Sequence, residues 1–192
     1  METSILGSSK ILCSPIASGA GSCTTTVRSR KSRRPADFGW DDTASVVPAK
    51  LVPTYSGSSA YLLLTKYNNY SSAGGDGINK LAILDPNVAA LDPVSGAMVM
   101  KEILTVAGLT PDPVLPAVRE WCINTAAIDP FTKSALVNRE DGKLYRWDFA
   151  TNTLIQPIVL TPGIGEAYTP TFVGVDGTVY AINNATLFAV GN

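Results

Sequence analysis

Short apolar segments separated by turn residues make up most of the chain after residue 36. Apolar and polar side chains alternate within several of them, which is the period-two pattern of a strand that buries one face. No segment of ten or more residues carries the apolar stripe of a helix. The pattern therefore predicts an all-β fold, with strands over residues 58–70, 78–86, 96–108, 119–130, 133–141, 143–149, 154–160, 170–175, 178–183 and 186–190.

The turns between these segments carry recognisable hairpin signals. Asp141-Gly142, Asp176-Gly177 and Asn183-Asn184 are pairs that supply the positive φ angles of two-residue hairpin turns. Segment 96–108 mixes strand-forming and helix-forming residues, and we assign it to a strand because Gly96 and Gly108 bracket it.

Segment 143–149, KLYRWDF, predicts two different faces. Its aromatic residues Tyr145, Trp147 and Phe149 share one face, which we expect to be buried, and the residues between them share the other. Asp148 stands at the strand end, where its carboxylate is expected to accept hydrogen bonds from backbone N–H groups of the next turn.

A repeated unit links these segments. Aligning the turn glycines places DGKLY (141–145) over DGTVY (176–180), and aligning Lys-Leu pairs places KLAILDPN (80–87) over KLYRWDFA (143–150). The second alignment puts Asp85 over Asp148. The spacing is uneven, with 63 residues from Asp85 to Asp148 and 35 from Asp148 to Asn183. Such recurrence is typical of repeat architectures.

The stretches DGKLYRWDFATNTL, DGTVYAINNATLF and ALDPVSGAMVM resemble the repeats of PQQ-like (quinoprotein-type) β-propellers, over roughly residues 58–192. The resemblance implies a partial β-propeller built of antiparallel four-stranded blades. At about 40–50 residues per blade, residues 37–192 would hold about three to four blades, fewer than many closed propellers. Residues 86–118 then read as a Pro-rich insertion, a loop that we expect to contact a partner.

Residues 1–36 differ from the rest of the chain. They are rich in Ser and Thr and carry a net charge of +5, against −6 for residues 37–192, which together give the −1 of the whole chain. Three interpretations remain open: a disordered tail, a targeting peptide, or a segment unrelated to the downstream domain. The basic run 28–34 is a weak signal for nucleic acid, because the rest of the chain is acidic.

Candidate chemistry is sparse. The chain has no histidine, which removes histidine-based catalytic triads and imidazole zinc ligands. Its three cysteines have no metal-ligand spacing, and Cys122 reads as a small buried side chain. Cys13 and Cys23 could form a disulfide in an oxidising compartment. We interpret Trp40, Trp121 and Trp147 as core or blade-interface residues and residues 73–77 as a loose hairpin loop. Asp41 and Asp42 are weak candidates for a metal site, because consecutive strand residues face opposite ways, and Glu166 is a candidate carboxylate with no identified partner.

The sequence thus favours a non-catalytic β-propeller-type binding or scaffold domain, which can be a fragment of a longer protein. No catalytic, cofactor-binding or metal-binding residue is assigned, and no cofactor is expected. The alternative, implied by the family resemblance alone, is a fragment of a quinoprotein-like oxidoreductase, whose enzymes place a quinone over a Trp and bind calcium. Expected partners are a protein or a small molecule, with self-association through open sheet edges. The sequence contains no run of 18 apolar residues, so we expect no membrane-spanning helix.

Overall fold

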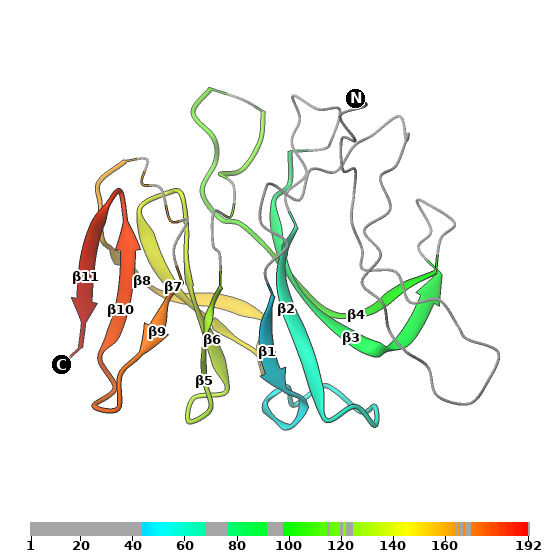
Figure 1. Cartoon of the computed structure of the whole chain (residues 1–192). Coiled ribbons are helices and arrows are strands. Elements are labelled where there is room, and N and C mark those ends of the chain that lie inside the picture. The colour runs from blue at the N-terminus through cyan, green and yellow to red at the C-terminus, as the bar shows by residue number, and fades with distance from the viewer. Residues whose placement is uncertain are drawn as a thin grey trace, which may run out of the picture.

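The computed structural model describes residues 44–67, 77–91, 98–114, 116–119, 121, 125–163, 165, 167 and 170–191. These residues form three antiparallel sheets and one short 3-10 turn, so the predicted all-β class is confirmed. The sheets stand side by side in Figure 1, in the order in which the chain enters them. The described residues show no closed ring of sheets.

The first sheet has the strand order β1-β2-β3-β4, which is also the chain order. Its elements are β1 (Ser45–Pro48), β2 (Tyr61–Tyr67), β3 (Lys80–Leu91) and β4 (Met98–Ala107), with the 3-10 turn η1 (Ala49–Leu51) after β1. Every strand pairs antiparallel with the next, which makes the sheet a simple meander.

The second sheet is a meander of the same kind, and the third is a shorter version of it. The second sheet contains β5 (Ala127–Asp129), β6 (Ser134–Asn138), β7 (Lys143–Asp148) and β8 (Thr153–Val159). The third sheet contains β9 (Phe172–Val173), β10 (Val179–Asn183) and β11 (Thr186–Val190). Among the described residues, the third sheet has no fourth strand beyond β11.

The first strands of the three sheets lie next to one another. β1 contacts β5, and β5 contacts β9. Between the first two sheets, the Ser45 hydroxyl donates to the carbonyl of Ala126 and accepts from its N–H, each at 2.9 Å. Between the second and third, the N–H of Thr171 donates to the carbonyl of Thr125 at 3.1 Å. The sheets are thus joined at their first strands, with the fourth strands at the opposite edge.

The aromatic face of β7 forms the core between the first two sheets, as predicted. Tyr145, Trp147 and Phe149 are buried there. The opposite face of β7 is also covered, because Leu144 packs against Val179 of the third sheet. Alternate side chains of β7 therefore pack into two different cores, one on each side of the second sheet.

The loop interpretation of residues 86–118 is wrong over much of its length. β3 continues to Leu91 and pairs with β4, so this stretch is largely a long hairpin with a β-bulge near Asp85. The assignment of 96–108 to a strand is confirmed. Residues after Gly108 do form a connection, closed by a bridge between Pro111 and Val118. The prolines after Gly108 therefore indicated a loop correctly, whereas β4, within the same predicted insertion, belongs to the first sheet.

The structure also corrects the first repeat alignment. β7 is the third strand of its sheet, whereas β10 is the second strand of its own, so the two Asp-Gly turns open strands at different positions. Gly142 and Gly177 take positive φ as predicted, but Asp141 and Asp176 do not. The last two-residue turn is Asn184-Ala185, one residue later than the predicted Asn183-Asn184. The strand that matches β10 in position is β6. Asp-Gly turns occur between different strand pairs, so they identify a hairpin without giving its place in the sheet.

The strands β6 and β10, which hold the same position in their sheets, bring two asparagines together between the second and third sheets. Asn138 ends β6 and Asn183 ends β10, and Nδ2 of Asn183 donates to Oδ1 of Asn138 at 3.0 Å. Nδ2 of Asn138 in turn donates to the carbonyl of Ile182 at 2.7 Å. Gly165 leaves room for this pair, since a Cβ there would lie 1.7 Å from Oδ1 of Asn183. The contact fixes the third sheet against the second.

Candidate functional site

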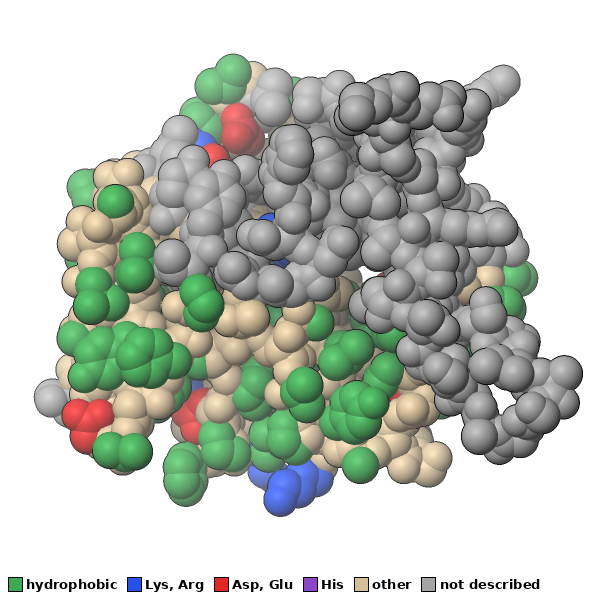
Figure 2. Space-filling view, in the orientation of Figure 1, with side chains coloured by type: hydrophobic (Ala, Val, Ile, Leu, Met, Phe, Trp, Pro, Cys, Tyr) green, Lys and Arg blue, Asp and Glu red, His purple; other side chains and the backbone are tan. Residues whose placement is uncertain are grey.

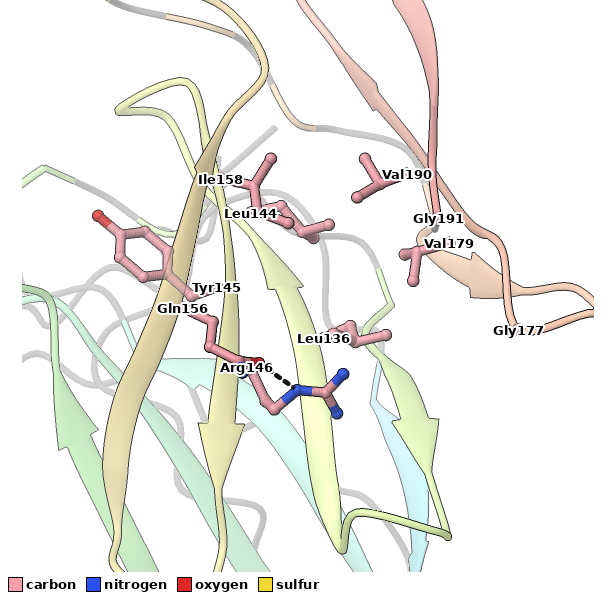
Figure 3. Close-up of a pocket in the computed structure, with 10 residues that line it drawn as sticks. All are labelled: Leu136, Leu144, Tyr145, Arg146, Gln156, Ile158, Gly177, Val179, Val190 and Gly191. Atoms are coloured by element: carbon pink, nitrogen blue, oxygen red, sulfur yellow. Dashed lines mark hydrogen bonds between the residues drawn. The ribbon is translucent and has the colours of Figure 1, made fainter.

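A groove of about 290 Å³ lies between the second and third sheets (Figure 3). Its apolar walls come from five strands of the two sheets: Leu136, Leu144, Ile158, Val179 and Val190. Figure 3 shows these side chains directed toward one another, whereas the ring of Tyr145 points away from them. We take this groove as the candidate binding site and call it the β8–β11 groove.

Strand alternation produces the groove. On β7, Leu144 and Arg146 face the third sheet, because their neighbours Tyr145 and Trp147 face the first. On β10, Val179 and Ala181 face back toward the second sheet. The groove reaches Val190 and Gly191 at the end of β11.

The polar end of the groove is formed by Arg146. Its guanidinium is 2.8 Å from Oδ2 of Asp129, donates to Oγ of Ser134 at 2.7 Å, and donates from Nε to Oε1 of Gln156 at 3.0 Å. A further hydrogen bond joins it to Thr132. Because its charge is balanced by Asp129, this end of the groove suits an uncharged polar group better than an anion.

The carboxylate of Asp129 is held in its ionised form. Burial alone would raise the pKa of Asp129, but hydrogen bonds from the Thr132 hydroxyl, the Arg146 guanidinium and the backbone N–H groups of Thr132 and Phe131 lower it below its usual range. The same contacts close the turn between β5 and β6.

We predict that Asp129 makes the fold acid-sensitive. A carboxyl whose folded pKa is depressed contributes stability that is present above its ordinary pKa of about 3.9 and is lost as pH falls through the folded value. Asp129→Asn should therefore lower the denaturation midpoint at pH 7, and the gap from the unchanged protein should narrow at pH 3. Urea unfolding at both pH values measures this. A gap of equal size at the two values would contradict the prediction.

A second polar cluster is buried between the first two sheets. Arg139 lies over the ring of Trp121, with its Cζ 4.8 Å from the ring centroid, and its Nη1 is 3.5 Å from Oδ2 of Asp141. The hydroxyls of Tyr145 and Thr110 both donate to Asp141. Burial lowers the pKa of Arg139, whereas burial and the hydrogen bond to Asp141 raise that of Tyr145. The cluster is closed to solvent, so we interpret it as structural.

A third polar group surrounds Asp85, beside a pocket of about 380 Å³ on the first sheet. The hydroxyls of Tyr55 and Ser59 donate to its carboxylate at 2.6 Å each, and the N–H of Asn87 donates at 3.0 Å. Burial would raise the pKa of Asp85, but these bonds and the charge of Lys101 lower it. Asp85 therefore anchors the 55–59 loop to the β3 bulge.

The predicted role of Asp148 is confirmed. Its Oδ1 accepts the N–H groups of Ala150 and Thr151 at 2.8 and 2.9 Å, which closes the turn before β8. These bonds lower the pKa of Asp148, and the bond from the N–H of Thr151 has the largest effect. The carboxylate caps a turn, as the sequence indicated.

Neither described tryptophan fits a stacked quinone. Trp121 and Trp147 are fully buried, and their rings contact Tyr145 and Phe149 edge to face. A planar cofactor would have to displace these core contacts. Gly77 is described and takes a positive φ. Several candidates lie outside the described residues: Cys13, Cys23, Trp40, Asp41, Asp42, residues 73–76, Cys122, Glu166 and the whole segment 1–36.

The described residues contain no group of three or more Cys, Asp or Glu side chains placed to hold a metal ion. No helix among them has the length and apolar character needed to cross a membrane. In the comparisons with known proteins, no family model matches the chain. No curated protein sequence matches it either.

The groove residues were not singled out from the sequence. Leu144, Val179 and Val190 read as ordinary strand residues, and only the packing of the second sheet against the third brings them together. One signal was present in the sequence: Leu144 adds an apolar residue to the face of β7 opposite its aromatic residues.

Proposed function

We propose that the chain is a non-catalytic β-propeller-type binding or scaffold domain whose ligand lies in the β8–β11 groove. The observation that carries the proposal is the open apolar groove between two sheets that are otherwise tightly joined. Ligand sites are commonly concave and mainly apolar, with a few fixed polar groups. The groove has this composition, with Arg146 and Gln156 as its polar groups.

The arrangement of the sheets supports the propeller part of the proposal. Meanders of up to four strands, joined at their first strands and open at their fourth, are how propeller blades stand around an axis. The three sheets would then be three blades, the third without its outer strand. Light scattering during size-exclusion chromatography of residues 37–192 tests this: a compact monomer or a defined oligomer agrees with it, and heterogeneous aggregate does not.

The non-catalytic part rests on the state of the polar groups that touch the groove. The guanidinium of Arg146 is engaged by Asp129, Ser134 and Gln156 and holds strands together. The bonds of its Nε and Nη1 are directed at the fold, and the charge of the guanidinium is balanced by Asp129. Turnover of alcohols or sugars in a dye-linked assay with quinone and calcium would contradict this part.

A thermal-shift screen tests the groove itself. Small apolar molecules and short extended peptides are screened against the unchanged protein, against Ile158→Asp, which places a charge in the groove, and against Val159→Asp, its matched control. Both residues are exposed on β8, but only Ile158 lines the groove. We expect ligands that raise the melting temperature of the unchanged protein and the control but not of Ile158→Asp. Ligands that stabilise all three would place binding elsewhere.

A further inference from the structure

We propose that the β8–β11 groove binds a compact neutral molecule with an apolar body and one terminal carbonyl oxygen, which accepts hydrogen bonds from Arg146 and Gln156. This inference rests on the proposed function and specifies the chemical class of its ligand. The apolar walls of the groove and its polar end would contact different parts of the same molecule. Figure 3 shows Arg146 and Gln156 together at one end, with Leu144 and Ile158 farther along.

Arg146 keeps one nitrogen atom uncommitted. Its Nε donates to Gln156 at 3.0 Å, and its Nη1 is directed at Asp129 and Ser134 at 2.8 and 2.7 Å. Its Nη2 has no hydrogen-bond acceptor among the described residues. The side chain is 22% exposed, so it is not sealed in the core. The two N–H groups of Nη2 are therefore available to a ligand.

Gln156 supplies the second donor. A guanidinium only donates, so the amide of Gln156 must present its oxygen, Oε1, to Arg146, and its Nε2 is left as the other end. Nε2 has no acceptor among the described residues, and the side chain is exposed. The bond to Arg146 thus holds two unused donor groups next to each other.

The backbone of Gln156 is held in an unusual conformation. Its φ is 50°, and Pro157 follows it, although a residue before proline normally takes an extended conformation. The pairing of β8 with β7 shifts register at this point, between Leu144 and Arg146. A non-glycine residue at positive φ costs free energy, and such strain is concentrated at binding and catalytic sites. Here it accompanies the placement of the Gln156 amide beside Arg146.

Apolar surface alone does not distinguish the groove. Figure 2 shows hydrophobic side chains gathered over the third sheet, at the left of the view. Phe172 and Tyr180 stack with their ring centroids 4.7 Å apart, on the face of this sheet opposite to Val179 and the groove. An apolar molecule can therefore find contacts on either face, whereas the donors of Arg146 and Gln156 belong to the groove.

The two donors select the ligand group. A carbonyl oxygen has two lone pairs and can accept one bond from each donor, whereas a group that only donates finds no acceptor in this pair. A carboxylate would also accept both bonds, but Asp129 already balances the charge of Arg146. A neutral acceptor then loses less solvation on entering an apolar groove. The volume of about 290 Å³ lies at the small end of ligand sites, which span roughly 300–1,000 Å³, so the body should be a single ring.

The test uses the full chain and four single-ring probes in nuclear magnetic resonance titrations: acetophenone, ethylbenzene, benzoate and benzylamine. Gln156→Glu keeps the acceptor for Arg146 but replaces the Nε2 donor by a carboxylate oxygen. We expect this change to weaken acetophenone binding by about tenfold, the loss of one good hydrogen bond, to leave ethylbenzene binding within about twofold, and to strengthen binding of the benzylamine cation. Val159→Glu, which adds the same charge on β8 outside the groove, should change none of these affinities.

The infrared spectrum of bound acetophenone tests the hydrogen bonds on the unchanged protein, whether or not Gln156→Glu folds. We expect its carbonyl stretch at a lower wavenumber than in cyclohexane. An unshifted stretch, equal losses of acetophenone and ethylbenzene binding in Gln156→Glu, or benzoate binding more tightly than acetophenone would overturn the inference. It would also fall if no probe binds. The proposed function would still stand if other ligands in the thermal-shift screen stabilise the unchanged protein but not Ile158→Asp.

Discussion

Replacing Trp147 by alanine is expected to lower the free energy of unfolding by about 3–5 kcal/mol, the usual cost of removing a fully buried Trp from a core. The side chain has no exposed surface and meets Phe149 edge to face, with ring centroids 5.6 Å apart. Its Nε1 donates to Oδ1 of Asn152 at 3.1 Å, and Nδ2 of Asn152 donates to the carbonyl of Thr105 in β4 at 3.1 Å. Trp147 therefore fills the core and supports a contact between the first two sheets.

Urea unfolding followed by circular dichroism measures this loss. Phe131→Ala is the matched control, since Phe131 is an aromatic residue in the turn between β5 and β6 and is 95% exposed. The control should change stability by less than about 0.5 kcal/mol. A Trp147→Ala protein as stable as the control would mean that the two sheets do not pack through this residue.

Local hairpin signals and strand alternation were readable from the sequence. Gly142 and Gly177 mark hairpins because glycine reaches positive φ at low cost, and that signal lies within the turn. The aromatic face of β7 was readable because its three rings share one side. β1 was missed, since four residues ending at Pro48 are too short for a periodic pattern.

The position of each strand in its sheet was not readable. β7 and β10 follow the same Asp-Gly signal, yet they are the third and second strands of their sheets. The difference is set by contacts far apart in sequence, such as the pair formed by Asn138 and Asn183. The groove has the same origin: its walls come from two sheets, and no local pattern encodes how these sheets pack against each other.

A second large effect is expected at the buried ion pair of Arg139 and Asp141. Asp141→Asn keeps a side chain of similar shape but removes the nearest negative charge, which leaves a guanidinium with no exposed surface and only the weaker influence of Glu140. Leaving one charge of a buried pair uncompensated costs about 3–5 kcal/mol. Arg139 also donates to the carbonyl of Arg119, but its Nε and Nη1 have no hydrogen-bond acceptor among the described residues. The charge on Asp141 is therefore the main compensation.

A double-mutant cycle separates charge from shape at this pair. Arg139→Met keeps much of the apolar contact with Trp121 and removes the cation. The double variant, Arg139→Met with Asp141→Asn, should be more stable than Asp141→Asn alone by about 2 kcal/mol or more, since replacing a buried pair with neutral residues of similar volume is often neutral. Urea midpoints of the four proteins provide the measurement. If the double variant were as unstable as Asp141→Asn alone, the loss would come from the hydrogen bonds of Tyr145 and Thr110 to the carboxylate, and the charge of Arg139 would be compensated elsewhere.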